Sequence, residues 1–355
     1  MLERLPALNR ASDDPVRLSR RRLLGWGGAA AAGLMLAGCG GDDEGDVDAE
    51  GSPATSPPGA PQSFDGRTIT VALYAKNHAS SPLFWQQFAP EGLTVEPQIF
   101  TSGSDMNRAM DAGDLDFGLM GPYNSLIEAE QGFRSKIICM CSREGIGLVA
   151  RADRGIDSVA DLAGTTIAVP PPGVQVLVLT ALLDEAGLEF ERDLRAVPLG
   201  YADHAAALER GDVDAYIGTE PPVTTSVVSG TGKRLEAVYS TPVGDFNTAM
   251  WAAPHVQDDH ELLAAVVRMQ RDAAEHLTPG GENDPQVWRN LLVEQFGYPE
   301  PVYEAVLSNI GAVWDFDETR RAQLEGAGEL MLASGVLSRE PDYESLYLLD
   351  HLPEP

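Results

Sequence analysis

The sequence predicts an α/β protein with two lobes, each built on its own β-sheet, and two strand–loop–helix units carry this prediction. In the first unit, residues 157–188, a polar helical turn and a turn at Gly164 precede a buried strand at Thr166–Val169. The loop Pro170–Gly173 then leads into a helix that runs to about Glu185. The first turn of a helix has free backbone N–H groups, so such a corner is a site for an anionic or strongly polar ligand.

The second unit repeats this order in residues 115–132, with a strand at Leu115–Met120, a loop at Gly121–Pro122 and a helix from about Tyr123. A further repeat supports the two-lobe prediction, because MDAGDLDFGLMGPYNSL and LERGDVDAYIGTEPPVT both contain a helix end, a Gly-Asp turn, a strand and a Pro-bearing loop that opens a helix. We expect these corners to come from both lobes and to face one shared cleft.

The N-terminal 39 residues are typical of an export signal rather than of folded structure. Paired arginines at Arg20–Arg22 precede an apolar run of 16 residues, which is short for a bilayer span, and the run ends in Leu-Ala-Gly-Cys at Cys39. The arginines resemble a twin-arginine signal, and the last four residues resemble a bacterial lipobox, in which the cysteine is lipidated. A plain membrane anchor with a chance cysteine is the alternative. Residues 40–65 are rich in Gly, Asp, Glu, Ser and Pro, which predicts a flexible tether.

Composition excludes several classes of protein. The 355 residues carry a net charge of −29, so non-specific nucleic-acid binding is not expected. An apolar fraction of 43% is ordinary for a globular protein and too low for a polytopic membrane protein. Cys139 and Cys141 share one face of an expected strand and are interpreted as small buried hydrophobic residues. No metal-ligand spacing accompanies them, so we expect no metal and no cofactor.

Elements of the first lobe follow from alternating apolar patterns and from turn residues. Pro97 lies within the second strand and predicts an edge position or an early bend, because proline has no N–H to donate. Ser104 is the expected N-cap of the helix that follows. The expected strands and helices are Thr68–Tyr74, Pro82–Phe88 (helix), Leu93–Phe100, Asp105–Ala112 (helix), Leu115–Met120 with its helix, Ile137–Cys141 and Ile146–Ala150.

The second lobe is expected to begin near Arg151, and the chain is expected to return to the first lobe along a strand at Phe246–Ala252. Strands that alternate with helices predict parallel sheets. Besides the first unit, the expected elements of the second lobe are Leu194–Pro198, Ala202–Arg210 (helix), Val213–Ile217, a helix opened by Thr219–Pro221, and Leu235–Tyr239. The tail is expected to be helical at Glu261–Leu277, Pro285–Phe296, Pro301–Leu307, Glu318–Ser334 and Asp342–Leu349.

Over residues 68–340 the chain resembles the solute-binding proteins of ABC importers for nitrate, taurine, aliphatic sulfonates and thiamine-pyrimidine precursors. The resemblance rests on motifs in a fixed order: Gly113–Gly118, Gly121-Pro122, Ser158–Gly164, Ile167–Val169, Gly187-Leu188, Gly211–Ala215 and Glu220-Pro221. It implies the type II periplasmic-binding-protein fold, with a discontinuous first lobe and two strands as the hinge. The implied domains are a signal at 1–39, a tether at 40–65, lobe one at 66–150 and 246–355, and lobe two at 151–245.

The sequence departs from the family pattern at two places. The loop after Ile167–Val169 usually carries ligand-binding Ser, Thr or His, and here it is Pro170–Val174. The common Trp-Glu-Pro is Thr219–Pro221. Both changes argue against a sulfonate or nitrate and favour a larger or more apolar organic ligand.

Candidate ligand contacts lie at the carboxyl ends of strands and at helix starts, where α/β sheets bind ligands. Tyr123 and Asn124 are the first choice, because they combine an aromatic face with an amide. For the others a structural role is the alternative: Lys76 and His78 as surface side chains, Ser102 and Ser104 as helix caps, and Glu220 as a partner of the helix dipole. The full set is Lys76, Asn77, His78, Ser102, Ser104, Tyr123, Asn124, Gln175, Tyr201, Glu220 and Asn247.

These observations predict an extracytoplasmic solute-binding protein that is not an enzyme. Its expected partners are a small organic or anionic solute, an ABC permease with its ATPase, and the membrane through a lipid on Cys39; a monomer is expected, anchored to the outer face of the cytoplasmic membrane or located in the periplasm. Two alternatives stay open. The first is an enzyme on the same lobes, of the menaquinone-pathway or pyrimidine-synthesis type. The second is a surface lipoprotein without a transport role.

Overall fold

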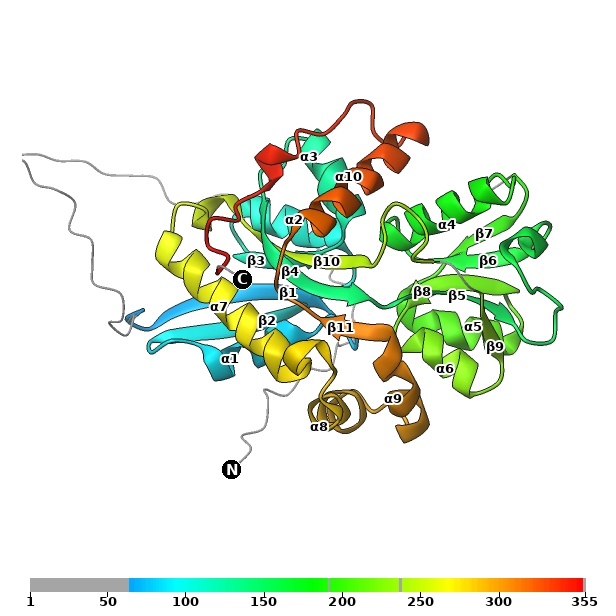
Figure 1. Ribbon diagram of the computed structural model, residues 1–355, viewed down its shortest axis with the longest axis horizontal. Helices are drawn as coiled ribbons and strands as arrows, with labels where there is room; N and C mark the ends of the chain where they lie inside the picture. Colours follow the sequence, from blue (N-terminus) through cyan, green and yellow to red (C-terminus); the bar gives the residue numbers. More distant parts are fainter. Residues whose placement is uncertain (1–63, 191, 236–237, 354–355) are drawn as a thin grey trace, which may run out of the picture. The chain divides into compact units, whose positions relative to one another are not determined.

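Two mixed β-sheets form the framework of the computed structural model, which describes residues 64–190, 192–235 and 238–353 (Figure 1). The predicted export signal, Cys39 and nearly all of the predicted tether therefore lie outside the described residues. In the part of the chain that is described, no helix combines the length and apolar character needed to cross a membrane.

The first sheet has the strand order β11-β4-β10-β3-β1-β2. Strand β2 lies at its edge, as Pro97 predicted, and it runs parallel to β1. The short strand β11 was not predicted, because three residues between two helices give no alternation to read. The strands are β1 (Arg67–Tyr74), β2 (Leu93–Phe100), β3 (Phe117–Met120), β4 (Lys136–Glu144), β10 (Phe246–Ala252) and β11 (Ile310–Ala312).

The second sheet has the order β7-β6-β8-β5-β9. Strand β5, which was predicted to belong to the first lobe, pairs with β8 and β9 of the second sheet. By strand pairing alone, the boundary between the lobes would therefore lie at the turn at Gly145 rather than at residue 150. The strand predicted at Leu235–Tyr239 is wrong in its position along the chain. The structure has strand β9 at Gly232–Leu235, and β9 pairs with Leu148–Arg151 of β5. The strands are β5 (Ile146–Arg151), β6 (Thr166–Val169), β7 (Arg195–Pro198), β8 (Ala215–Thr219) and β9 (Gly232–Leu235).

The prediction of parallel sheets is only partly correct. Strand β10 is antiparallel to both β3 and β4, and β5 is antiparallel to both β8 and β9. Both exceptions are the strands with which the chain enters a sheet from the other one, β5 after β4 and β10 after β9, so no helical crossover within one sheet sets their direction.

Helices connect the strands largely where the sequence predicted them. Ser102, not Ser104, is the N-cap of α2: its hydroxyl accepts a hydrogen bond from the backbone N–H of Asp105. The helix predicted at Asp342–Leu349 is only one turn, Glu344–Leu346. The α-helices are α1 (Trp85–Phe88), α2 (Gly103–Ala112), α3 (Pro122–Glu130), α4 (Val174–Glu185), α5 (His204–Arg210), α6 (Pro222–Val228), α7 (His260–Leu277), α8 (Pro285–Arg289), α9 (Glu300–Val306) and α10 (Glu318–Ala333).

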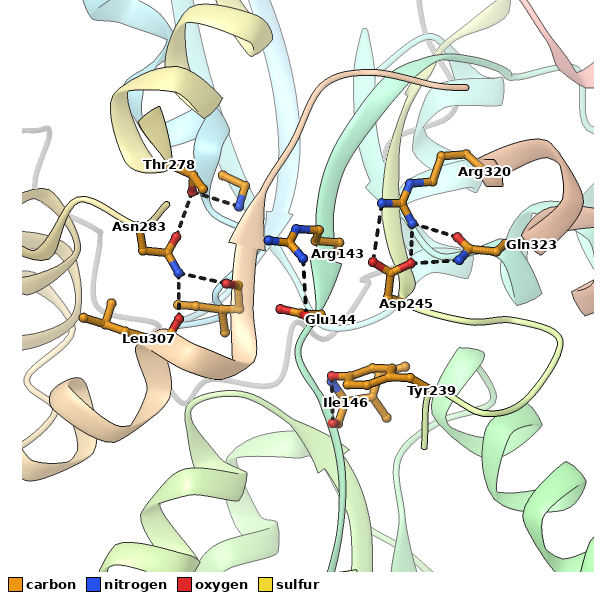
Figure 2. A network of polar contacts seen from close by, with 12 residues as sticks. Arg143, Glu144, Ile146, Tyr239, Asp245, Thr278, Asn283, Leu307, Arg320 and Gln323 are labelled. Atoms are coloured by element: carbon orange, nitrogen blue, oxygen red, sulfur yellow. Dashed lines mark hydrogen bonds and ion pairs between the residues drawn. The ribbon is translucent and has the colours of Figure 1, made fainter. Parts of the chain in front are cut away.

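The chain passes between the two sheets twice, between β4 and β5 and between β9 and β10, which agrees with the predicted discontinuous first lobe and two-strand hinge. Figure 2 shows the polar contacts that hold these crossings together. The Tyr239 hydroxyl accepts a hydrogen bond from the N–H of Ile146 and donates one to its carbonyl, both at 3.1 Å. On the return crossing, the Asp245 carboxylate accepts hydrogen bonds from Arg320 and from Gln323 of α10. The two crossings are also joined directly, because the Glu144 N–H donates to the Asp245 carbonyl at 2.8 Å.

Candidate ligand-binding site

Two adjoining cavities lie at the carboxyl ends of strands from both sheets. The inner cavity has a volume of about 30 Å³, and the outer cavity has a volume of about 600 Å³. Four residues line both of them: Tyr74, Asn77, Tyr201 and Thr219. Tyr74 and Thr219 are the last residues of β1 and β8, so the cavities lie where parallel strands of α/β sheets usually present ligand-binding groups.

The inner cavity is bordered by the two predicted loop-to-helix corners. Gly121 and Gly173 are the N-caps of α3 and α4, and neither helix has a side-chain capping bond. A Cβ built on Gly121 would lie 3.5 Å from the Val174 side chain, so the two corners are in contact. The structure thus confirms that these corners meet, and the positive ends of two helix dipoles border one small space.

Neutral polar side chains complete the inner lining. Asn77, Asn124, Gln175 and Asn247 are all buried, and each exposes less than a tenth of its surface. All four of these amides are held by other side chains, and Asn247 accepts from the Ser142 hydroxyl at 3.3 Å. Asn77 donates to the Thr219 hydroxyl at 3.2 Å, Asn124 donates to Ser104 at 3.3 Å, and Gln175 accepts from the Tyr201 hydroxyl at 3.0 Å.

The two tyrosines at the junction of the cavities are neutral. Burial is the largest cause that raises the pKa of both hydroxyls, and for Tyr74 the proximity of two acidic groups, Tyr201 and Glu128, adds to the rise. Their rings meet edge to face, with 6.5 Å between centroids. Each hydroxyl can therefore donate a hydrogen bond at any physiological pH, and both tyrosines line the inner as well as the outer cavity.

The outer cavity is lined mainly by aromatic and small side chains. Its five rings belong to Tyr74, Phe100, Tyr201, Phe296 and Tyr298. The charged side chains of this lining are Lys76 and Asp203, and both are exposed. Tyr298 is tied to the loop after β1, because its hydroxyl donates to the Lys76 carbonyl at 3.2 Å.

The predicted contact residues divide into two groups. Asn77 and Tyr201 line both cavities, Lys76 lines the outer one, and Asn124, Gln175 and Asn247 line the inner one. Five others line neither cavity: His78, Ser102, Ser104, Tyr123 and Glu220.

Tyr123 was a first choice for ligand contact, but its side chain lines neither cavity. Pro122 is the first residue of α3, and Tyr123 follows it one step around the helix. Successive helical residues point about 100° apart. The half-buried Tyr123 side chain therefore lies off the cavity wall that its neighbour Asn124 lines.

Glu220 has a structural role in this arrangement. Its side chain is fully buried, accepts hydrogen bonds from the backbone and hydroxyl of Thr224 at 3.0 Å each, and pairs with Arg234. Burial raises the pKa of its carboxyl, and Arg234 opposes the rise. The carboxylate thus stabilises the start of α6, as the alternative interpretation of this residue held.

His78 lines neither cavity and lies against the first crossing. Its ring packs on Gly145, and neither ring nitrogen has a hydrogen-bond partner in the described part of the chain. Burial lowers its pKa to about 4, an effect that the backbone of Glu220 partly opposes. A neutral, buried imidazole packed against the crossing turn replaces the predicted surface or ligand-binding histidine.

Glu128 was not predicted and lines neither cavity, but Ser104 links it to Asn124 of the inner lining. It is 3% exposed, and Asn107 donates a hydrogen bond to its carboxyl. Burial raises its pKa to about 7, while hydrogen bonds from Asn107 and Ser104 and the charge of Arg108 oppose the rise. The folded protein therefore holds this proton more tightly than the unfolded chain does.

Glu128→Gln should stabilise the protein at high pH. The stability that the Glu128 proton contributes is complete below about pH 4.5 and is lost as the pH rises through about 7. We expect the free energy of unfolding, measured with urea, to be about 2–3 kcal/mol higher for the variant than for the wild type at about pH 8. Near pH 4.5 the two free energies should be equal. Glu130→Gln on the same helix is the control, because Ser338 holds the pKa of Glu130 below its ordinary value. An equal effect of Glu128→Gln at both pH values would contradict the assignment.

Sequence reasoning missed several lining residues. Tyr74 ends the predicted strand Thr68–Tyr74, so the rule for strand carboxyl ends could have found it. Thr219 ends β8, but that strand was predicted only as far as Ile217, and Thr219 was assigned to the opening of the next helix. Phe296 and Tyr298 follow α8 in the tail, where no sequence signal links them to the strands of either sheet. Only the packing of the tail brings these two rings to the cavity.

Comparison with known proteins gives consistent results. Residues 87–279 match the family model described as NMT1/THI5 like. A protein of Brucella abortus (strain 2308) that is named as a binding protein is 30% identical over 282 residues, which cover 77% of this chain and 85% of the relative. The taurine-binding periplasmic protein of Escherichia coli (strain K12) is 31% identical over 195 residues, which cover 54% of this chain and 58% of that protein.

Solved structures show the same fold. The alkanesulfonate-binding protein SsuA from Xanthomonas axonopodis pv. citri, bound to MOPS, superimposes with a TM-score of 0.68. The match covers 79% of this chain and 98% of that protein, at 19% identity. The two-sheet α/β architecture is thus that of the type II periplasmic solute-binding proteins.

Proposed function

The chain belongs to the NMT1/THI5-like family, and from this premise we propose that it is the extracytoplasmic solute-binding protein of an ABC importer. It captures a small organic or anionic solute in the paired cavities and delivers it to a membrane permease with its ATPase. The observation that carries the proposal is the meeting of the Gly121 and Gly173 helix starts at a polar cavity between strands of both sheets. Relatives named as taurine-binding and alkanesulfonate-binding support the class of function.

Capture requires that the solute favours the arrangement in which both sheets contact it. We propose that the two crossings near Gly145 and Asp245 are the hinge, and that the lobes meet at this line. The residues that hold the solute are then Asn77, Asn124, Gln175, Tyr201 and Asn247, with Lys76 at the rim. We also propose that the protein acts as a monomer.

The proposal gives the protein no catalytic role. Its relatives are binding proteins by name. The described lining of the two cavities holds no cysteine, histidine or glutamate, and its charged side chains, Lys76 and Asp203, are both exposed. Turnover of a bound compound by the purified protein would favour the enzyme alternative instead.

A thermal-shift screen of sulfonates, nitrate, small carboxylates and pyrimidines tests the function. A true solute at about one hundred times its dissociation constant should stabilise the protein by about 2.7 kcal/mol. Failure of every class to raise the melting temperature, with no solute retained by the purified protein, would contradict the proposal.

Gln175→Ala should weaken the binding of the compound that the screen selects. The loss of one buried hydrogen-bonding amide, together with the Tyr201 hydroxyl that it leaves without an acceptor, should raise the dissociation constant roughly tenfold or more. Gln286→Ala, at an exposed site on α8, is the matched control and should leave the dissociation constant unchanged. Equal affinities for both variants would remove Gln175 from the site.

We further propose that the protein is exported through its twin-arginine motif and anchored by a lipid on Cys39. Cys39→Ser in the native host should abolish labelling by a fatty-acid analogue and move the protein from the membrane fraction to the soluble fraction. Unchanged membrane association of this variant would favour the plain membrane anchor instead.

A further inference from the structure

The two cavities differ in size and in chemistry, and this difference points to the shape of the solute. The outer cavity, at about 600 Å³, is within the range of organic ligand sites, whereas the inner one, at about 30 Å³, has room for only a compact group. A solute that filled only the inner cavity would leave the outer cavity without a function.

The inner lining is suited to a polar or anionic head. Its polar groups are four amides, four hydroxyls and two helix starts without side-chain caps, and its apolar part is Val174 with the rings of Tyr74 and Tyr201. None of its described residues carries a charged side chain. Amides can both donate and accept, and helix N-termini favour negative charge. These groups can bind a compact head without an arginine, which is the side chain that usually binds an isolated strong anion.

The outer lining is suited to a ring or another bulky apolar group. Five aromatic rings and Pro171 and Pro222 surround it, and its charged side chains, Lys76 and Asp203, are exposed. Aromatic faces stack on planar groups, and each buried apolar surface adds to affinity. Phe296 is 4% exposed, so this wall is held in place by the protein core.

The cavities adjoin at Tyr74, Asn77, Tyr201 and Thr219, which line both. A single solute can therefore extend past the tyrosine pair, with its head among the amides and its body among the rings. The Tyr201 hydroxyl already contacts Gln175 on the inner side, while its ring lines the outer side.

We propose that the solute is amphipathic, with a compact polar or anionic head in the inner cavity and a ring-bearing or bulky apolar body in the outer cavity. It is thus a larger molecule than nitrate or taurine. This inference rests on the proposed solute-binding function and specifies the class of molecule that the same site takes.

Calorimetric titration of the full chain after ligand removal tests the inference with three matched series. Each series keeps one head (sulfonate, carboxylate or primary amide) and enlarges the body from methyl to phenyl to naphthyl, and nitrate is titrated alongside. In at least one series the naphthyl member should bind about 30- to 100-fold more tightly than the methyl member, because its ring leaves water. Binding of nitrate, or of a methyl member, within threefold of the tightest ring-bearing compound would overturn the inference and leave the proposed function intact.

Mass spectrometry of material released from the freshly purified, denatured protein covers solutes outside these series. A released ring-bearing or otherwise bulky organic compound supports the inference, and a released solute of the size of nitrate or taurine overturns it. Absence of binding by every compound and of any released solute would instead overturn the proposed function itself.

Tyr298→Ala separates the two parts of the solute. It should raise the dissociation constants of the ring-bearing members about tenfold and those of the methyl members less than twofold, because Tyr298 lines only the outer cavity. Phe88→Ala removes a half-buried ring that lines neither cavity and serves as the control. An equal loss of affinity for ring-bearing and methyl members in Tyr298→Ala would show that the outer cavity does not contact the body of the solute.

Discussion

Gly145→Ala is expected to destabilise the protein by about 2–5 kcal/mol. Gly145 has a φ of +79°, which costs a residue with a Cβ about 1–2 kcal/mol. The added Cβ would also lie 2.0 Å from the His78 ring, and overpacking of this kind costs about 1–3 kcal/mol more. The turn cannot move away easily, because its N–H donates to Asn309 and its carbonyl accepts from Glu220, both at 2.9 Å.

Urea unfolding of a double-mutant cycle separates the two causes. In a His78→Ala background the clash is gone, so the added cost of Gly145→Ala should fall to the backbone term of about 1–2 kcal/mol. Gly155→Ala is the control: its φ is +66°, but a Cβ there meets nothing within 4 Å, so it should cost only about 1 kcal/mol. Strictly additive losses at positions 78 and 145 would show that the imidazole does not pack on this turn.

Arg234→Ala is expected to cost about 3 kcal/mol at about pH 8, because it leaves the fully buried Glu220 carboxylate without its counter-charge. Among the residues that the structure describes, Thr224 alone would then donate to that carboxylate. Burial already raises the pKa of Glu220, and loss of Arg234 should raise it further. The cost should therefore shrink as the pH falls and the carboxyl takes up a proton.

Two further variants test whether this cost arises from an uncompensated charge. Adding Glu220→Gln to Arg234→Ala should restore most of the lost stability, since a neutral amide needs no counter-charge. Arg210→Ala breaks an ion pair with Asp212 in which both side chains are more than half exposed, and it should cost less than about 1 kcal/mol. Similar losses in Arg210→Ala and Arg234→Ala, or no rescue by Glu220→Gln, would contradict a buried charge at this position.

Local elements were predictable where short-range physics decides them. The boundaries of β6 and β10 are those that the sequence predicted, because a run of apolar residues between turn signals defines each strand. Pro97 correctly placed β2 at a sheet edge, since a missing N–H is a property of one residue. The serine that caps α2 was assigned two residues too late, because Ser102 and Ser104 offer the same hydroxyl and only backbone geometry selects between them.

The candidate site was predictable in part, for the same reason. Asn124 and Gln175 line the inner cavity because each occupies the first turn of a helix that begins at a glycine corner. Glu220 was named as a possible contact, but a side chain from β9, Arg234, pairs with it. No local pattern announces that pairing, which depends on where β9 lies against β5.

By itself the sequence determined the two loop-to-helix corners, most strand and helix positions and the family, because hydrophobic period, turn residues and motif order are local properties. The tertiary structure decided the strand directions, the contact between the corners and the division of the site into a small polar cavity and a large aromatic one. Those features depend on contacts between residues far apart in the chain, such as Tyr74 with Tyr201 and Tyr298 with Lys76, and these form only when both sheets and the tail have packed.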